Sequence, residues 1–273
     1  MANEKPENVI EIEHLVAHYG DRVILQDINL SIRSGEIMVI MGGSGSGKTT
    51  LMRNMLGLNK PTSGSIRIFG KDITRIKRRE LYEIRRRIGV SFQGGALLGS
   101  MTVAENIELP LRQHTHLDES TIRIMSRMKL EVVNLAGFEN LMPSELSGGM
   151  VKRAALARSI VMDPNLLFFD EPSAGLDPVV SAELDELILR LKAAMNVAIV
   201  VVTHELESAL KIADRITVLG HGKLLMTGTV EEILASDNEE IQDMLHRRPR
   251  DEAVNAEEYL ARLTADRNKR RYI

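Results

Sequence analysis

The sequence predicts an α/β fold in which a buried parallel sheet is joined to an antiparallel β lobe and to an inserted helical lobe. Three continuous apolar runs are typical of parallel strands covered on both faces: Ile37–Met41, Leu166–Phe169 and Val197–Val202. Residues 9–33 instead alternate in period two, which is typical of strands with one exposed face. Helical patterns separate these segments, as the α/β class requires.

Length and composition limit the classes of protein that fit. The 273 residues, with 44% hydrophobic and 27% charged side chains, suit one α/β domain with a short tail. The net charge of −3 offers no basic field for nucleic acid, and the absence of cysteine excludes disulfides and thiolate metal sites. The longest apolar runs fall far below the roughly 20 residues that span a bilayer, so we expect a membrane role only through docking onto another protein.

The remaining elements follow in chain order. Ser65–Gly70 continues the alternation of the β lobe, and the helical lobe is expected within residues 93–164, with helices over Thr121–Ala136 and Met150–Met162. Apolar positions from Val180 predict a helix that ends near Asn196. A hairpin around Gly220–Gly222 and a capping box at Thr229–Glu232 come next. We therefore predict one domain over residues 9–245 and a C-terminal tail over residues 246–273.

A glycine-rich segment, the phosphate loop, follows the first buried run and precedes a helix that runs toward Gly57. It matches the pattern G-x-x-x-x-G-K-[ST], in which backbone N–H groups and a helix N-terminus bind phosphate, so the fold is of the P-loop NTPase (RecA-like) type. We expect Lys48 to reach the β and γ phosphates of ATP and the Thr49 hydroxyl to hold Mg²⁺. A flexible Gly/Ser loop is the alternative, but it gives no reason for Lys-Thr at this junction. The predicted nucleotide-binding residues are Gly42, Gly43, Ser44, Gly45, Ser46, Gly47, Lys48, Thr49 and Thr50.

Two carboxylates end the second buried run, at the edge of the sheet where open α/β folds bind ligands. Asp170 suits the Mg²⁺ shell, and Glu171 is then placed to orient and deprotonate the attacking water. Two solvated acids at a strand end are common in any α/β protein, so this interpretation depends on the phosphate loop.

Three further side chains are candidates for nucleotide contacts because of the phosphate loop and the acid pair. His204 ends the third buried run and could contact the γ-phosphate, and the Gln93 amide could sense both Mg²⁺ and the γ-phosphate. Tyr19, in the β lobe, could stack on adenine. Taken alone, each of the three would be interpreted as a structural residue.

A second glycine-rich helix start appears at Leu146–Met150, before an Ala-rich stretch of high helix propensity. It predicts a second anion site, formed by Ser147, Gly148 and Gly149, which we call the signature tip. One chain thus carries two half-sites for one kind of ligand.

The ordered motif set resembles that of ABC ATPases over residues 9–235: GGSGSGKT, the Gln93 loop, LSGGM, LLFFDEP, Ser173–Asp177 and His204. The resemblance implies that two copies pack head to tail, so that ATP on one phosphate loop is closed by Ser147 and the glycine amides of the other copy. Met150 stands where glutamine is common in the family. Because Ser147 and the backbone donors remain, we expect activity to survive.

More narrowly, QGGALLGSMTVAENIELPLRQHT and PSELSGGM resemble the ATPase subunit of Mla-type phospholipid transporters. This resemblance implies a peripheral subunit at the cytoplasmic face of the inner membrane of a Gram-negative bacterium, where it powers lipid transport. The implied partners are a membrane permease, a periplasmic MCE-domain lipid-binding protein and a small STAS-domain protein.

Other interpretations stay open at the level of the sequence. An ABC ATPase for a different substrate would carry the same motifs. A soluble ABC ATPase acting on nucleic acid or the ribosome is opposed by the net charge and the single cassette, and a binding-only switch is disfavoured by Glu171 and His204. The basic stretch Arg75–Arg87 is a solvated helix face or a contact for acidic lipid head groups or the permease. The C-terminal basic cluster is interpreted as a solvated tail, or, as the resemblance to ABC ATPases implies, Tyr259–Ile273 could reach the neighbouring ATPase.

Overall fold

The computed structural model describes residues 7–248, which fall into two compact units, one ending at Ser236 and the other beginning at Asp237. The second unit contains a short helix, α9 (Glu239–Leu245), capped by the Asn238 side chain. The charged composition there did not predict it. The predicted domain boundary between residues 245 and 246 stays a prediction, because residues 249–273 lie outside the described part of the chain.

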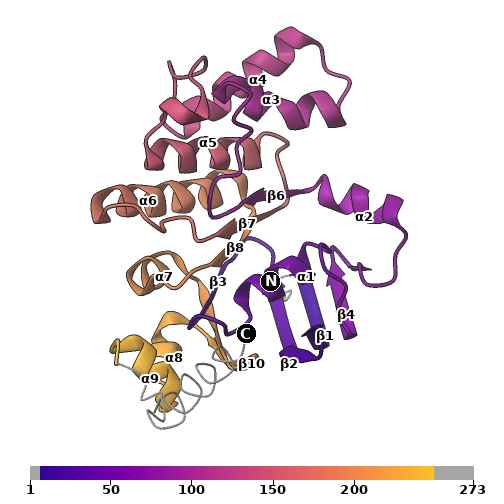
Figure 1. Cartoon of the computed structure of the whole chain (residues 1–273), viewed down its shortest axis with the longest axis vertical. Coiled ribbons are helices and arrows are strands. Elements are labelled where there is room, and N and C mark those ends of the chain that lie inside the picture. Colours follow the sequence, from indigo (N-terminus) through magenta and orange to yellow (C-terminus); the bar gives the residue numbers. More distant parts are fainter. Residues whose placement is uncertain (1–6, 249–273) are drawn as a thin grey trace, which may run out of the picture. The chain divides into compact units, whose positions relative to one another are not determined.

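Four strands form an antiparallel sheet in the order β2-β1-β4-β5, grouped at the lower right of Figure 1. Buried positions alternate with more exposed ones at the end of β2 and along β4, which confirms the strands predicted there from period-two patterning, whereas register shifts interrupt the alternation in β1. The strands are β1 (Asn8–Tyr19), β2 (Arg22–Arg33), β4 (Ser63–Ile68) and the two-residue β5 (Lys71–Asp72).

Six strands form the second sheet in the order β10-β9-β3-β8-β7-β6, parallel except for β10. The three apolar runs are its central strands, and their residues are buried on both faces, as predicted. The antiparallel pair β9–β10 is the predicted hairpin. The strands are β3 (Ile37–Gly42), β6 (Ile88–Ser91), β7 (Leu166–Asp170), β8 (Ala198–Val202), β9 (Arg215–Gly220) and β10 (Lys223–Gly228).

The edge strand β6 was not predicted because its sequence, Ile-Gly-Val-Ser, is short and weakly apolar. Gly89 shows why a glycine stands there. A Cβ at this position would lie 2.0 Å from the Ser159 backbone oxygen and 2.7 Å from a Leu167 methyl carbon. The absence of a side chain thus lets the helix that carries Ser159 lie directly against β6.

Three helices, α3 (Val103–His114), α4 (Glu119–Val132) and α5 (Gly148–Ile160), gather at one end of the first unit, at the top of Figure 1. The predicted helices correspond to α4 and α5, which both start about half a turn earlier because Asp118 and Ser147 cap them, and α4 ends about one turn before the predicted Ala136. α3 was missed although Thr102 and Glu105 form a capping box. The other helices of this unit are α1 (Lys48–Met55), α2 (Arg78–Arg85), α6 (Pro178–Met195), α7 (Leu206–Ile212) and α8 (Val230–Leu234).

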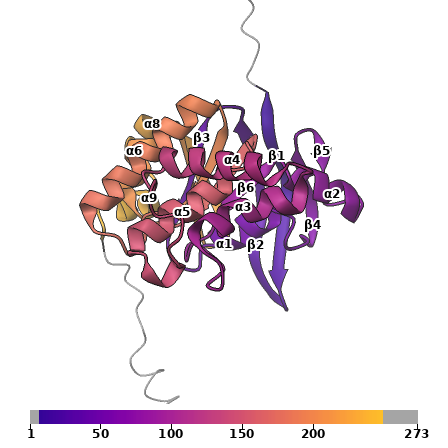
Figure 2. The same ribbon diagram turned by 90° about the horizontal axis from the view of Figure 1, so that it is seen from above.

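The two sheets share one hydrophobic core that includes α1. Leu51, Met52 and Met55 of this helix cluster with Ile28 of β2 and Ile40 of β3. Figures 1 and 2 both place the antiparallel strands and α6 on opposite sides of the first unit. The helix that follows the phosphate loop is therefore held between the two sheets.

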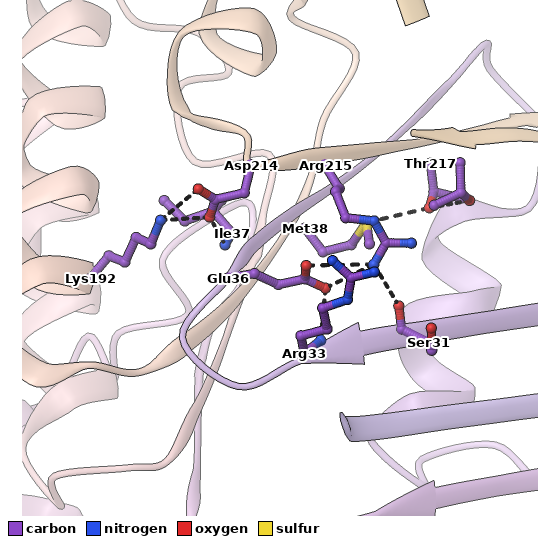
Figure 3. Close-up of polar contacts among 10 residues, drawn as sticks. Ser31, Arg33, Glu36, Ile37, Met38, Lys192, Asp214, Arg215 and Thr217 are labelled. Atoms are coloured by element: carbon purple, nitrogen blue, oxygen red, sulfur yellow. Dashed lines mark hydrogen bonds and ion pairs between the residues drawn. The ribbon is translucent and has the colours of Figure 1, made fainter. Parts of the chain in front are cut away.

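A polar joint fixes the starts of β3 and β9 (Figure 3). The Arg215 guanidinium donates to the Ser31 backbone oxygen at 3.2 Å and to the buried Glu36 carboxylate at 3.3 Å. The Asp214 carboxylate accepts from the Ile37 backbone N–H at 2.6 Å and pairs with Lys192. This joint lies at the N-terminal ends of the parallel strands.

The basic stretch Arg75–Arg87 divides into an exposed part and a structural part. Lys77, Arg78 and Arg79 are exposed, as expected for a solvated face. Its C-terminal arginines instead serve the fold, since Arg85 donates to two backbone oxygens after α1 and the Arg87 guanidinium stacks 4.0 Å from the centre of the Phe69 ring. Within residues 7–248 no helix is long and apolar enough to cross a membrane.

Candidate active site

Four neighbouring parallel strands end at one edge of the second sheet, and each delivers one of the predicted motifs there. β3 leads into the phosphate loop, β8 into Thr203 and His204, β7 ends with Asp170 before Glu171, and β6 precedes Gln93. Adjacent strands lie about 4.8 Å apart, so these motifs are spaced by single strand widths. The sheet order thus brings together residues that are separated by more than 150 positions in the chain.

The phosphate loop turns sharply between β3 and α1. Gly47, just before Lys48, has a φ of 102°, which only glycine adopts without strain. A Cβ there would also lie 2.6 Å from a Leu25 methyl carbon of β2, so the β lobe packs directly on the loop. The Ser46 hydroxyl is buried and, among the described residues, has no hydrogen-bond partner. A glycine-rich turn at a helix N-terminus, beside an unpartnered hydroxyl, fits a bound polyphosphate.

Lys48 begins α1 with its ammonium group turned back onto the loop. The group donates to the backbone oxygens of Gly42 at 2.7 Å and Gly43 at 3.1 Å. Burial lowers the pKa of Lys48, and the negative charges of Glu171 and Asp170 oppose that shift. The acid pair therefore acts electrostatically on the phosphate-loop lysine, an interaction that the sequence did not predict.

The predicted oxygen donors for Mg²⁺ are Thr49, Gln93 and Asp170. The first two are exposed. Burial, and next the charge of Glu171, raise the pKa of Asp170, while Arg53, Lys152 and Lys48 oppose the shift. Within residues 7–248 no group of three or more His, Cys, Asp or Glu side chains could hold a metal. A set with one carboxylate fits Mg²⁺, which binds through one or two carboxylates plus substrate phosphates.

Glu171 is nearly buried and has a φ of 48°, a conformation that costs a non-glycine residue about 1–3 kcal/mol. Its backbone N–H donates to the Val202 oxygen at 2.8 Å. Its carboxylate accepts from the Thr203 hydroxyl at 3.1 Å and lies 2.8 Å from His204 Nδ1. The strained backbone thus aims the carboxylate along the sheet edge toward the end of β8.

His204 was expected to contact the γ-phosphate directly. The structure places its Nδ1 against Glu171 and its Nε2 3.4 Å from a Glu205 carboxylate oxygen, with 57% of the side chain exposed. The contact with Glu171 identifies an orienting partner for that carboxylate. Direct contact with a phosphate stays a prediction.

Two basic residues of α5 were missed by the sequence analysis. Lys152 donates to the backbone oxygens of Gln93 and Glu171, the latter at 2.9 Å. Arg158 donates to the backbone oxygens of Gly95 and Ala96, each at 2.8 Å. The sequence could have indicated that Lys152 is buried, because Ala155 and Leu156 at positions i+3 and i+4 place it on an apolar helix face, but it gave no sign of the two backbone acceptors.

Tyr19 and the signature tip lie at exposed positions. Tyr19 is 83% exposed at the end of β1, in the hairpin whose second strand contributes Leu25 to the phosphate loop. Ser147 caps α5, and its hydroxyl accepts from the Met150 backbone N–H at 3.3 Å. Gly148 is exposed, and Gly149 lies against Val180 of α6. Stacking on adenine and binding of a partner's nucleotide stay predictions for these residues.

Comparison with known proteins agrees with this geometry. Residues 25–174 match the family model described as ABC transporter. The chain is 47% identical over 232 residues to the intermembrane phospholipid transport system ATP-binding protein MlaF of Haemophilus influenzae, covering 85% of this chain and 88% of that protein. It is 42% identical over 258 residues to the probable ribonucleotide transport ATP-binding protein mkl of Mycobacterium leprae, covering 91% and 74%.

A solved structure shares the fold. It is a dimeric ATP-binding cassette in a post-hydrolysis state bound to ADP and Pi, 31% identical, with a TM-score of 0.75 over 81% of this chain and 98% of that chain. The architecture, the motif-bearing sheet edge and these similarities lead to one conclusion. The chain belongs to the ABC transporter family.

Proposed function

We propose that this chain binds ATP with Mg²⁺ and hydrolyses it as the ATPase subunit of an ABC transporter. The observation that carries the proposal is the delivery of the phosphate loop, Asp170, Glu171, His204 and Gln93 to one sheet edge by four adjacent strands. Mg²⁺ held by Thr49, Gln93 and Asp170 would neutralise charge on the phosphates.

The side chains divide the chemistry between them. The Glu171 carboxylate takes a proton from water as the water oxygen bonds to the γ-phosphorus and the bond from that phosphorus to the β-bridging oxygen breaks, giving ADP and inorganic phosphate. Thr203 and His204 keep the carboxylate oriented through the contacts at 3.1 and 2.8 Å. Lys48 supplies positive charge beside the β and γ phosphates.

The working unit in this proposal is a head-to-tail dimer. The exposed Ser147 caps a helix whose N-terminal amides suit an anion, and the related cassette of known structure is dimeric with bound ADP and Pi. The signature tip of one copy would close the nucleotide held by the phosphate loop of the other. Met150 leaves the hydroxyl and the backbone donors in place.

For the cargo we propose phospholipid, moved through a permease at the inner membrane of a Gram-negative bacterium. Support comes from the MlaF relative, which is more similar to this chain than the mkl relative named for ribonucleotide transport. An MCE-domain protein and a STAS-domain protein are the further partners in this proposal. Purification of the complex from its membrane, with identification of the subunits and lipids that copurify, tests the assignment. Ribonucleotide bound to the permease, rather than to the ATPase, together with no bound phospholipid would contradict it.

The sharpest test of the chemistry is Glu171→Gln. Loss of the general base should slow ATP hydrolysis by roughly 10²–10⁴-fold while ATP binding persists. The measurements are phosphate release and nucleotide affinity of the full chain with its permease. The matched control is Glu205→Gln, which alters the neighbouring carboxylate on the other side of His204 and should leave turnover close to wild type. Equal turnover by Glu171→Gln and wild type would remove Glu171 from this role.

A further inference from the structure

The helix behind the signature tip carries a buried lysine with an unusual set of acceptors. Lys152 is 8% exposed, and its ammonium group donates to the backbone oxygen of Gln93 and, at 2.9 Å, to that of Glu171. Gln93 follows β6 and Glu171 follows β7. One side chain of α5 therefore fastens two motifs of the sheet edge.

Burial of this ammonium group opposes folding unless the contacts offset it. Burial lowers the pKa of Lys152, and the negative charges of Glu171 and Asp170 oppose the shift. The surrounding positions of α5, among them Ala154, Ala155 and Ala157, are buried and apolar. An apolar residue at position 152 would avoid the desolvation cost, so the lysine has its effect through its two acceptors and its charge.

Both acceptors are backbone oxygens, so Lys152 fixes the paths of the chain that carry Gln93 and Glu171. The Glu171 residue is held from two sides, because its N–H donates to Val202 while its carbonyl accepts from Lys152. This is the residue with a φ of 48°. Release of one anchor would let the peptide relax and would turn the carboxylate away from Thr203 and His204.

Comparison with Arg158, a second basic residue of α5, shows that only the bond to Glu171 distinguishes Lys152. It anchors the same loop to α5 at Gly95 and Ala96 but has no contact with Glu171 among those the structure gives. Lys152 alone of the two joins the loop to the end of β7. It lies five residues after Ser147, about 7.5 Å along the helix axis.

We propose that Lys152 is a positioning residue for hydrolysis, which locks the backbones of Glu171 and Gln93 to α5 so that the base and the signature tip of one chain move as a single piece. This inference rests on the proposed ATPase function. In a head-to-tail dimer, the signature tip would hold the nucleotide that is bound to the partner's phosphate loop. Lys152 would thereby connect that nucleotide to Glu171, which acts on the nucleotide bound to this chain's own phosphate loop.

The test compares Lys152→Met with Lys152→Arg in the full chain with its permease. Methionine keeps the length but loses the donors and the charge, so kcat should fall about 10–100-fold while the affinity for ATP stays within about 3-fold, since small misplacements of catalytic groups cost up to this much. Arginine keeps charge and donors and should recover most of the loss. Lys129→Met is the matched control, because it removes a largely covered lysine that pairs with Asp163 outside the site.

A second measurement separates positioning from folding. In a Glu171→Gln background, Lys152→Met should leave ATP-dependent dimerisation intact, because Ser147 and the phosphate loop are unaltered. Unchanged kcat in Lys152→Met would overturn the inference. So would a parallel loss of ATP affinity, dimerisation and thermal stability that arginine does not restore. Wild-type turnover by the single variant Glu171→Gln would instead contradict the proposed role of Glu171 in hydrolysis. The inference about Lys152 would then fail as well, because it depends on that role.

Discussion

At the scale of single residues, the neighbouring carboxylates of Asp170 and Glu171 differ in the groups that surround them. Glu171 has its carboxylate beside the Thr203 hydroxyl and His204. Asp170 is half-buried, and its raised pKa shows that burial and the charge of Glu171 outweigh the cations around it. The arrangement stores an electrostatic cost at Asp170 that a bound divalent cation would offset.

Asp170→Asn should therefore stabilise the nucleotide-free chain while abolishing metal-dependent hydrolysis. Because the pKa of Asp170 is raised on folding, the folded chain holds this proton more tightly than the unfolded chain. The wild-type free energy of unfolding thus falls as the pH rises from the unfolded value of 3.8 through the raised value. Between pH 4 and pH 8, the melting temperature of Asp170→Asn should exceed that of wild type. The difference should grow as the pH rises and reach a few degrees.

The control for this prediction is Asp21→Asn, at an exposed position, which should show no such pH-dependent gap. An Asp170→Asn chain that melts at or below the wild-type temperature at pH 7.5 would contradict the prediction. With Mg²⁺ and a non-hydrolysable ATP analogue, wild type should gain more stability than the variant, because only aspartate offers a charged ligand.

The identities of the site residues were predictable because each stands in a motif at a strand end or helix start. The conformation of Glu171 was not, since its positive φ is set by tertiary contacts with Val202 and Lys152. Lys152 was missed for a related reason. Its acceptors are backbone oxygens of two remote segments, which leave no side-chain pattern in the sequence.

At the scale of elements, predictability followed the strength of the local signal. β3, β7 and β8 were predicted because they are continuous apolar runs, and α6 because a stripe of apolar residues ends at Asn196, which adopts the left-handed conformation that stops a helix. β6 has no such run. Its place at the edge of the sheet depends on the close approach of α5 at Gly89.

Gly89→Ala should destabilise the first unit, because a methyl group would overlap the Ser159 backbone oxygen of α5. Overpacking of this kind costs typically 1–3 kcal/mol, and more where backbone must move. Chemical denaturation measures the loss, and turnover should fall as well because β6 leads to Gln93. Gly94→Ala is the control, since a Cβ there meets nothing within 4 Å. Equal stability of the two variants would refute this account of β6.

At the scale of the whole molecule, the order β3-β8-β7-β6 could not be read from the sequence, because any order of buried strands satisfies the same apolar pattern. That strand order brings the segments that follow β3, β8, β7 and β6 to one edge of the sheet, where they form the candidate site. The proposed head-to-tail dimer would add a second requirement, since each nucleotide would need the phosphate loop of one copy and the signature tip of the other.

Mixed dimers test this requirement. In a Glu171→Gln background, pairing a Lys48→Ala copy with a Ser147→Arg copy leaves one composite site intact, and it should retain one ATP per dimer. Pairing an otherwise unaltered copy with one that carries both substitutions damages both sites, and it should retain none. Two affinity tags isolate the mixed dimers, and retained nucleotide is then counted. Equal retention by the two pairings would exclude the head-to-tail arrangement.

The central place of β3 also has a consequence for biosynthesis. Its neighbours are β8 and β9, so Ile40 pairs beside Val202, whereas β1 and β2 are joined by a tight turn. Non-local pairing forms late, and during translation β3 cannot gain a partner in its own sheet until most of the chain has left the ribosome. A nascent or prematurely terminated polypeptide that ends before β8 therefore lacks both a partner strand for β3 and the segment that carries His204, so it has no complete ATP-hydrolysing site.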